Sequence, residues 1–199
     1  MSKKLTFLRI PKNASTSIYS FFGNANTIRN EYLSANNEKY LNVFEPSHCT
    51  LKEAKSILGD HIEDLPVLAV VRNPYERLVS MYFFARKHGL GSIYKINTEC
   101  FEKFANDFYE WSKNPNFFHA KSQIDYFKEC EKAYICRFEN LEGDLEKFIK
   151  NKNLDFDIHN LEKLNSTRHE GYRFYHTEKT KSIVKEMWGK DLSRFSYSY

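Results

Sequence analysis

The stretch "IPKNASTSI", residues 10–18, gathers residue types that can hold an anion. It lies between a short apolar segment and an apolar helical pattern, which predicts a loop leading from a strand into a helix. Amide groups at the start of a helix carry partial positive charge and attract phosphate or sulfate. Lys12 adds a full charge, and small or hydroxyl-bearing residues leave room for a ligand at these amides: Asn13, Ala14, Ser15, Thr16 and Ser17.

Taken alone, this loop also has an ordinary interpretation, a serine-capped amphipathic helix beside a solvated Lys12. The loop contains no glycine and lacks the GxxxxGK(S/T) pattern of nucleotide hydrolases. It therefore argues against a magnesium-dependent nucleotide hydrolase, while leaving a phosphate or sulfate ligand open.

A second motif, "VVRNPYERLVSMY", follows further along the chain at residues 70–82. Arg72 stands where an apolar strand ends, and its forked donors suit a phosphate. Ser80 lies one to two turns into the helix that follows. The ordinary interpretation is an Arg72 paired with a carboxylate, a neutral helical Ser80, and an Arg77 held in an ion pair with a nearby glutamate.

The elements that must position these residues alternate along the chain. Apolar runs predict strands at residues 5–10, 67–72 and 133–138, with a weaker one at 41–44, and each of the first three precedes a helical pattern. This alternation predicts an α/β fold with a parallel sheet flanked by helices. Ligands of such folds bind at the carboxyl ends of the strands, so the loops after Ile10, Val71 and Phe138 should share one edge.

The remaining segments predict a single compact domain over residues 1–199. Two helices are expected within an insertion at about residues 99–130, and a long helix with an aromatic end closes the chain. The aromatic content of 16% is enough to fill a core, which is the favoured role of these rings, although a ligand groove would use them too.

Charge and cysteine usage narrow the class of ligand. A net charge of +4 suits an anionic ligand but falls short of the basic stripe of a nucleic-acid binder. The four cysteines have no metal-ligand spacing, so no metal is expected. We expect a cytoplasmic protein, because no signal peptide is evident and the longest central apolar run, "LPVLAVV", is too short to span a membrane.

Together the two motifs resemble those of the sulfotransferase family. "IPKNASTSI" is similar to its 5′-phosphosulfate-binding loop, and "VVRNPYERLVSMY" is similar to its 3′-phosphate-binding segment. The similarity is greatest to the carbohydrate branch, the Golgi-type family 2. It extends through "ICRFENLEGDLEKFI" to "KDLSRFSYSY", which resembles the family's closing Asp-x-x-x-Phe-x-Tyr.

This resemblance implies a P-loop-like fold of three layers and 3′-phosphoadenosine 5′-phosphosulfate (PAPS) as the sulfate donor, with PAP as product and no metal. It implies that Lys12 contacts the bridging oxygen of PAPS and that residues 13–17 hold the 5′-phosphate. It further implies that Arg72 and Ser80 hold the 3′-phosphate.

Sulfuryl transfer to a hydroxyl requires a base, and histidine suits that role at neutral pH. His48, in "EPSHCTLKEAKSIL", precedes a helix whose N-cap would be Thr50, a position similar to that of the catalytic histidine in the carbohydrate branch. A surface-turn histidine is the alternative. His119 is the second candidate, with Gln123 on the same face if the segment is helical. The resemblance implies that this pair lies near the acceptor or the donor.

A late polar segment, "LNSTRHEGYRFY", resembles the family's loop that closes over PAPS. Ser166, Thr167 and Arg168 are its candidate donor contacts, and a solvated loop is the alternative.

The leading hypothesis is therefore a PAPS-dependent sulfotransferase that acts on an acceptor hydroxyl, with a carbohydrate favoured through the subfamily resemblance. Two alternatives are a P-loop-type nucleotide-dependent phosphotransferase and a non-catalytic module that binds anions or nucleic acid. The first would need a Walker-type lysine motif, and the second would not need Lys12 or His48.

Overall fold

The computed structural model describes residues 5–22, 48–58, 65–164 and 169–199. The chain divides into two compact units. The first, here called the sheet unit, draws on Met1–Val71 and Asp125–Asn165. The second, here called the helical unit, draws on Arg72–Ile124 and Ser166–Tyr199.

The sheet unit is built on three parallel strands. They are β1 (Thr6–Leu8), β2 (Val67–Val71) and β3 (Tyr134–Arg137), in the order β1-β2-β3. Phe7 pairs with Leu68, and Ala69 pairs with Ile135. The three stronger strand predictions are confirmed with slightly shorter bounds, whereas the expected strand at 41–44 lies outside the described residues. Because the strands are parallel, their carboxyl ends share one edge of the sheet.

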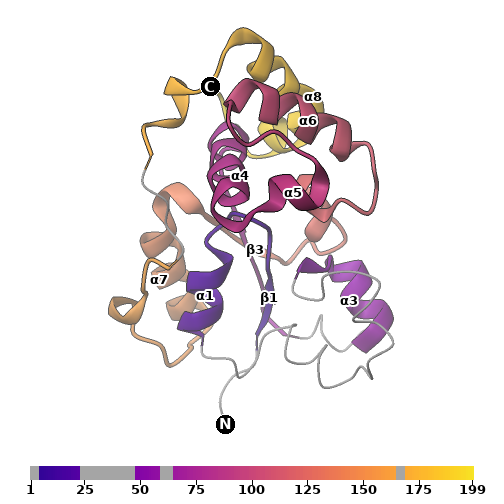
Figure 1. The fold of residues 1–199 in the computed structure, drawn as a ribbon. Coiled ribbons are helices and arrows are strands. Elements are labelled where there is room, and N and C mark those ends of the chain that lie inside the picture. The colour runs from indigo at the N-terminus through magenta and orange to yellow at the C-terminus, as the bar shows by residue number, and fades with distance from the viewer. Residues whose placement is uncertain (1–4, 23–47, 59–64, 165–168) are drawn as a thin grey trace. The chain divides into compact units, whose positions relative to one another are not determined.

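Two helices cover one face of this sheet. They are α1 (Ser15–Phe21) and α7 (Leu141–Asn151), and Figure 1 shows both on the same side of β1. Ile18 and Phe148 are fully buried in an apolar cluster with Phe7 and Leu68 of the strands. Burial of this apolar face fixes the helices that follow the first and third strands.

A third helix of the sheet unit, α3 (Leu51–Leu58), lies on the other side of β1 from α1 in Figure 1. Thr50 and Glu53 form a capping box at its start: the Thr50 amide donates to Glu53 Oε2 at 2.6 Å, and the Glu53 amide donates to Thr50 Oγ1 at 3.2 Å. The predicted N-cap is confirmed. The α/β prediction, a parallel sheet packed against helices, is confirmed as well.

The helical unit contains α4 (Pro74–His88), α5 (Leu90–Tyr94), α6 (Phe101–Ser112) and α8 (Glu178–Arg194). Figure 1 shows α4, α6 and α8 beside one another. Phe104, Phe108 and Trp188 are almost wholly buried between them, so aromatic rings do fill this core. Helix α8 bends at Trp188, whose φ and ψ of −130° and 28° are not helical. No helix in the described part of the chain is both long and apolar enough to cross a bilayer.

The segment after α6 differs from the expected second helix. It forms two short 3₁₀ turns, Phe118–Ala120 and Ile124–Tyr126. The amides of Gln123 and Ile124 donate to the carboxylate of Asp191 instead of to helical carbonyls. A tertiary hydrogen bond from a distant residue thus outweighs the local helical pattern.

Candidate functional site

The loop between β1 and α1 adopts an unusual backbone conformation. Lys12 and Ala14 have φ values of 69° and 56°, in the left-handed region that non-glycine residues rarely adopt. Turns of this kind direct neighbouring amide groups to one side and form concave anion sites. Backbone strain of about 1–3 kcal/mol per residue persists only where the surroundings enforce it, and such residues cluster at functional sites.

Asn13, between these two residues, anchors the loop to the sheet. Its side-chain nitrogen donates to the carbonyl of Val70 in β2 at 2.7 Å, and its amide donates to the carbonyl of Ile10 at 3.3 Å. Asn13 is almost wholly buried. Its contribution to an anion site is therefore to hold the loop in shape, a role that the sequence did not suggest.

The first turn of α1 suits an anion. Its N-cap, Ala14, has no side-chain oxygen to cap the amides, and no acidic residue lies in this turn. Ser15 is buried and Thr16 is half-buried. Ser17 is engaged elsewhere, because its hydroxyl accepts a hydrogen bond from the amide of Leu164 at 2.9 Å. The amides of the turn, with Ser15 and Thr16, are thus the best-placed groups for a phosphate.

His48 lies at the same end of β1. Its Nδ1 is 2.5 Å from the carbonyl oxygen of Arg9, which directly follows β1 and precedes Lys12 by three residues. A carbonyl only accepts, so Nδ1 must carry a hydrogen and donate it. The neutral ring then keeps its basic lone pair on Nε2. The sheet unit therefore brings Lys12, the start of α1 and His48 to one end of β1.

Arg72 begins the helical unit, directly after the last residue of β2. Its guanidinium is buried, and Nη2 contacts Glu76 Oε1 at 3.1 Å, so it does pair with a carboxylate. A phosphate at Arg72 would join or replace Glu76. Ser80 is also buried and lies in the second turn of α4, which confirms the helix predicted after Arg72.

The neighbouring Arg77 is fully buried on α4, and its contacts are with the protein's own backbone and core. Its terminal nitrogens donate to the carbonyls of Lys121 and His119, at 3.0 and 3.3 Å. The guanidinium lies over the ring of Trp188 at 4.7 Å. These contacts hold the segment after α6 against α4.

His119 and Gln123, the weaker predicted pair, do not share a helix face. His119 lies in a 3₁₀ turn, with its ring 4.1 Å from that of Phe118, and Gln123 follows that turn. Gln123 Nε2 donates to the carbonyl of Arg72 at 2.9 Å, and its Oε1 accepts from the Arg72 amide at 2.8 Å. Ser166, Thr167 and Arg168 lie outside the described residues.

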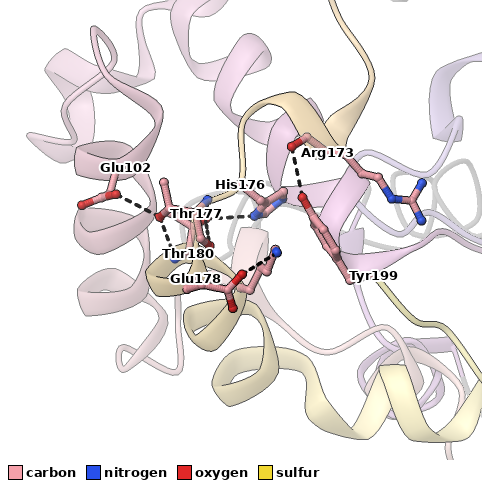
Figure 2. A network of polar contacts seen from close by, with 8 residues as sticks. Glu102, Arg173, His176, Thr177, Glu178, Thr180 and Tyr199 are labelled. Atoms are coloured by element: carbon pink, nitrogen blue, oxygen red, sulfur yellow. Dashed lines mark hydrogen bonds and ion pairs between the residues drawn. The ribbon is translucent and has the colours of Figure 1, made fainter.

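A polar network in the helical unit involves His176, which no sequence motif singles out (Figure 2). His176 Nε2 lies 3.0 Å from the carbonyl of Tyr75, near the start of α4, and its Nδ1 lies 3.1 Å from Thr180 Oγ1 in α8. Thr177 caps α8 and also donates to Glu102 at 2.9 Å. Only the fold brings these residues together. The network ties the start of α4, two residues after Arg72, to the start of α8.

Comparison with known proteins identifies the class. The model of the Sulfotransferase family matches residues 1–198, almost the whole chain. The protein therefore belongs to the sulfotransferase family, which covers carbohydrate sulfotransferases. Membership implies sulfuryl transfer from PAPS to an acceptor. Searches of curated proteins and of solved structures returned no match.

The His176 contacts predict a pH-dependent stability. Burial lowers the pKa of His176 below its ordinary value of 6.5, and it outweighs the hydrogen bond to the Tyr75 carbonyl, which raises that pKa; nearby Lys181 adds to the lowering. The unfolded chain therefore binds more protons between these two pKa values, so stability should fall as the pH drops from about 6.5 through the folded-state pKa. Thermal unfolding between pH 7.5 and 5.0 measures this loss. His176→Gln should lower the melting temperature at pH 7.5 but flatten its pH dependence.

The exposed His159 offers a matched control for this experiment, because its side chain lies at the surface. His159→Gln should retain the wild-type pH dependence. Equal slopes for wild type and His176→Gln would show that His176 does not carry the effect.

Proposed function

We propose that this sulfotransferase moves the sulfuryl group of PAPS to a carbohydrate hydroxyl, with His48 as the catalytic base. The observation that carries the proposal is the 2.5 Å hydrogen bond from His48 Nδ1 to the Arg9 carbonyl. It orients the ring beside the loop that contains Lys12 and assigns the basic lone pair to Nε2. Family membership supplies the reaction class.

The 5′ end of the donor is assigned to the loop after β1. Three features support this: two left-handed residues, an α1 N-terminus without a side-chain cap, and no acidic side chain in the first turn. These residues fit a phosphosulfate group. Lys12 is assigned to the phosphate oxygen that becomes more negative as the sulfur–oxygen bond breaks. A positive charge placed there stabilises the transition state more than the ground state.

The 3′-phosphate is assigned to Arg72 and Ser80, following the motif resemblance. A guanidinium binds phosphate through paired N–H donors, which gives directional as well as electrostatic selectivity. Ser166, Thr167 and Arg168 are assigned to the closing loop on the resemblance alone.

The reaction follows from these assignments. Nε2 of His48 accepts the proton of the acceptor hydroxyl while that oxygen forms a bond to sulfur. The bond between sulfur and the bridging oxygen breaks, and its electron pair leaves with PAP. Most of the rate gain then comes from positioning and from fixed charge, as in phosphoryl transfer.

Replacement of Lys12 tests the charge assignment. Lys12→Ala should lower kcat about 10²–10³-fold, the usual cost of removing one electrostatic contact to a transition state. Steady-state kinetics with labelled PAPS measures this loss. Lys95 is a matched control, because it is an exposed lysine that also has a positive φ, 53°. Lys95→Ala should leave kcat within about twofold, and an equal loss in both variants would refute the role of Lys12.

Two substitutions of His48 separate catalysis from anchoring. The side-chain amide of Asn can replace the Nδ1 donor to the Arg9 carbonyl, but it has no basic nitrogen. His48→Asn and His48→Ala should both lose about 10²–10⁴-fold in kcat and retain PAP binding. Recovery of activity in His48→Asn alone would show that the histidine only anchors the Arg9 carbonyl. Loss of PAP binding would place it in the donor site.

An acceptor screen tests the carbohydrate assignment. Labelled PAPS is supplied with panels of sugars, phenols and lipid alcohols, and sulfated products are identified by mass spectrometry. We expect transfer to sugar hydroxyls that is absent in His48→Asn. Transfer to phenols or lipids alone would overturn the carbohydrate assignment but leave the donor chemistry intact.

A further inference from the structure

A buried carboxylate in the helical unit holds a short stretch of backbone in place. Asp191, on α8, is fully buried. It accepts hydrogen bonds from the Ser122 hydroxyl at 2.7 Å, the Gln123 amide at 2.8 Å and the Ile124 amide at 3.0 Å. A buried carboxylate is costly unless such donors surround it, and donors held by a charged acceptor are firmly placed. Asp191 therefore determines where residues 122–124 lie.

A second contact from α8 reaches the same stretch. The indole nitrogen of Trp188 donates to the carbonyl of Ala120 at 2.7 Å. Trp188 is the residue at which α8 departs from helical geometry. Trp188 and Asp191, three residues apart, thus hold both ends of the segment 120–124.

Gln123 passes this restraint on to Arg72. Its carboxamide bonds to both the amide and the carbonyl of Arg72, at 2.8 and 2.9 Å. The paired bonds resemble those of a neighbouring strand, and they fix the backbone at the point where the Arg72 side chain departs. Gln123 is fully buried, so water does not compete for these bonds.

The residue after Arg72 is fixed as well. Asn73 accepts from the Tyr75 amide at 3.0 Å as the N-cap of α4, and its side-chain nitrogen donates to the carbonyl of Ser198 at 3.1 Å. Gln123 therefore restrains the Arg72 backbone directly, and the helix cap at Asn73 restrains the residue that follows it.

We infer that Gln123 and Asp191 are positioning residues for the grip of Arg72 on the 3′-phosphate. This inference rests on the proposed function, which assigns that phosphate to Arg72. Recognition of phosphate by a guanidinium depends on direction, and a displacement of about 1 Å at a binding group is costly. Asp191 places Gln123, and Gln123 places Arg72. Asp191 is also the first residue of the closing Asp-x-x-x-Phe-x-Tyr pattern.

Two nucleotides separate this role from a general structural one. PAP carries the 3′-phosphate, and 5′-AMP lacks it but is otherwise alike. Isothermal titration calorimetry gives the affinity of each variant for both. Gln123→Met keeps the side-chain length but removes both bonds to Arg72. It should weaken the affinity for PAP by about tenfold or more, while the affinity for 5′-AMP should change by less than about twofold. Asp191→Asn should likewise weaken the affinity for PAP more than the affinity for 5′-AMP.

Ser122→Ala is the matched control. It removes one of the three donors to Asp191 but leaves both bonds from Gln123 to Arg72, so the ratio of the two affinities should stay within about twofold of wild type. If Gln123→Met does not fold, Gln123→Glu answers the same question. It keeps the acceptor for the Arg72 amide but loses the donor to its carbonyl, and it should cause a smaller selective loss.

Arg72→Ala separates failure of this inference from failure of the proposed function. If Arg72→Ala loses the preference for PAP and the Gln123 variants keep it, the positioning role is wrong and the phosphate assignment stands. If Arg72→Ala retains the preference, the assignment of the 3′-phosphate to Arg72 is wrong, and the inference falls with it. Equal weakening of both nucleotides by Gln123→Met would mark a purely structural residue.

Discussion

Backbone groups near the carboxyl ends of the strands need hydrogen-bond partners once the sheet no longer supplies them. β1 pairs with β2 only as far as Leu8 opposite Ala69, and the next carbonyl of β2, that of Val70, receives the side-chain amide of Asn13. The carbonyl of Arg9 receives His48. Buried backbone groups are rarely left unsatisfied, so this requirement shapes the loops around them. In the sheet unit, satisfying these carbonyls also holds His48 and the loop that contains Lys12, the two groups proposed to take part in the reaction.

The same solution recurs in the helical unit at Arg72, where Gln123 bonds both backbone groups. The sequence predicts that Asn13, His48 and Gln123 each contact a ligand. Each proves to bond a main-chain group at or just beyond a strand end. For His48 this anchoring and a catalytic role are compatible, because the two ring nitrogens divide the tasks. For Gln123 the main-chain bonds take up both polar atoms of the carboxamide, so its effect on a ligand is through Arg72. For Asn13 the side-chain nitrogen bonds the Val70 carbonyl, which holds the loop that contains Lys12.

Local patterns sufficed for much of the fold. The apolar runs before Lys12 and Arg72 predict their strands, and the motif at residues 70–82 predicts the helix that the structure shows as α4. The capping box at Thr50 is likewise local. The conformation of Lys12 and Ala14 does not follow from local sequence, because neither residue type favours a positive φ without tertiary contacts. The Asp191 and His176 contacts join residues distant in sequence, and the expected helix after α6 gives way to the hydrogen bonds of Asp191.

Arg72 illustrates why a phosphate site and a structural ion pair resemble each other in sequence. A buried guanidinium needs compensating charge, and Glu76, one helical turn further on, supplies it at 3.1 Å. The same cation that a carboxylate stabilises is suited to a phosphate, which carries more charge and matches more of its donors. Glu76 can therefore keep the site folded before a ligand arrives. Discrimination for the 3′-phosphate then depends on the direction of the guanidinium, and that direction is what the bonds from Gln123 restrain.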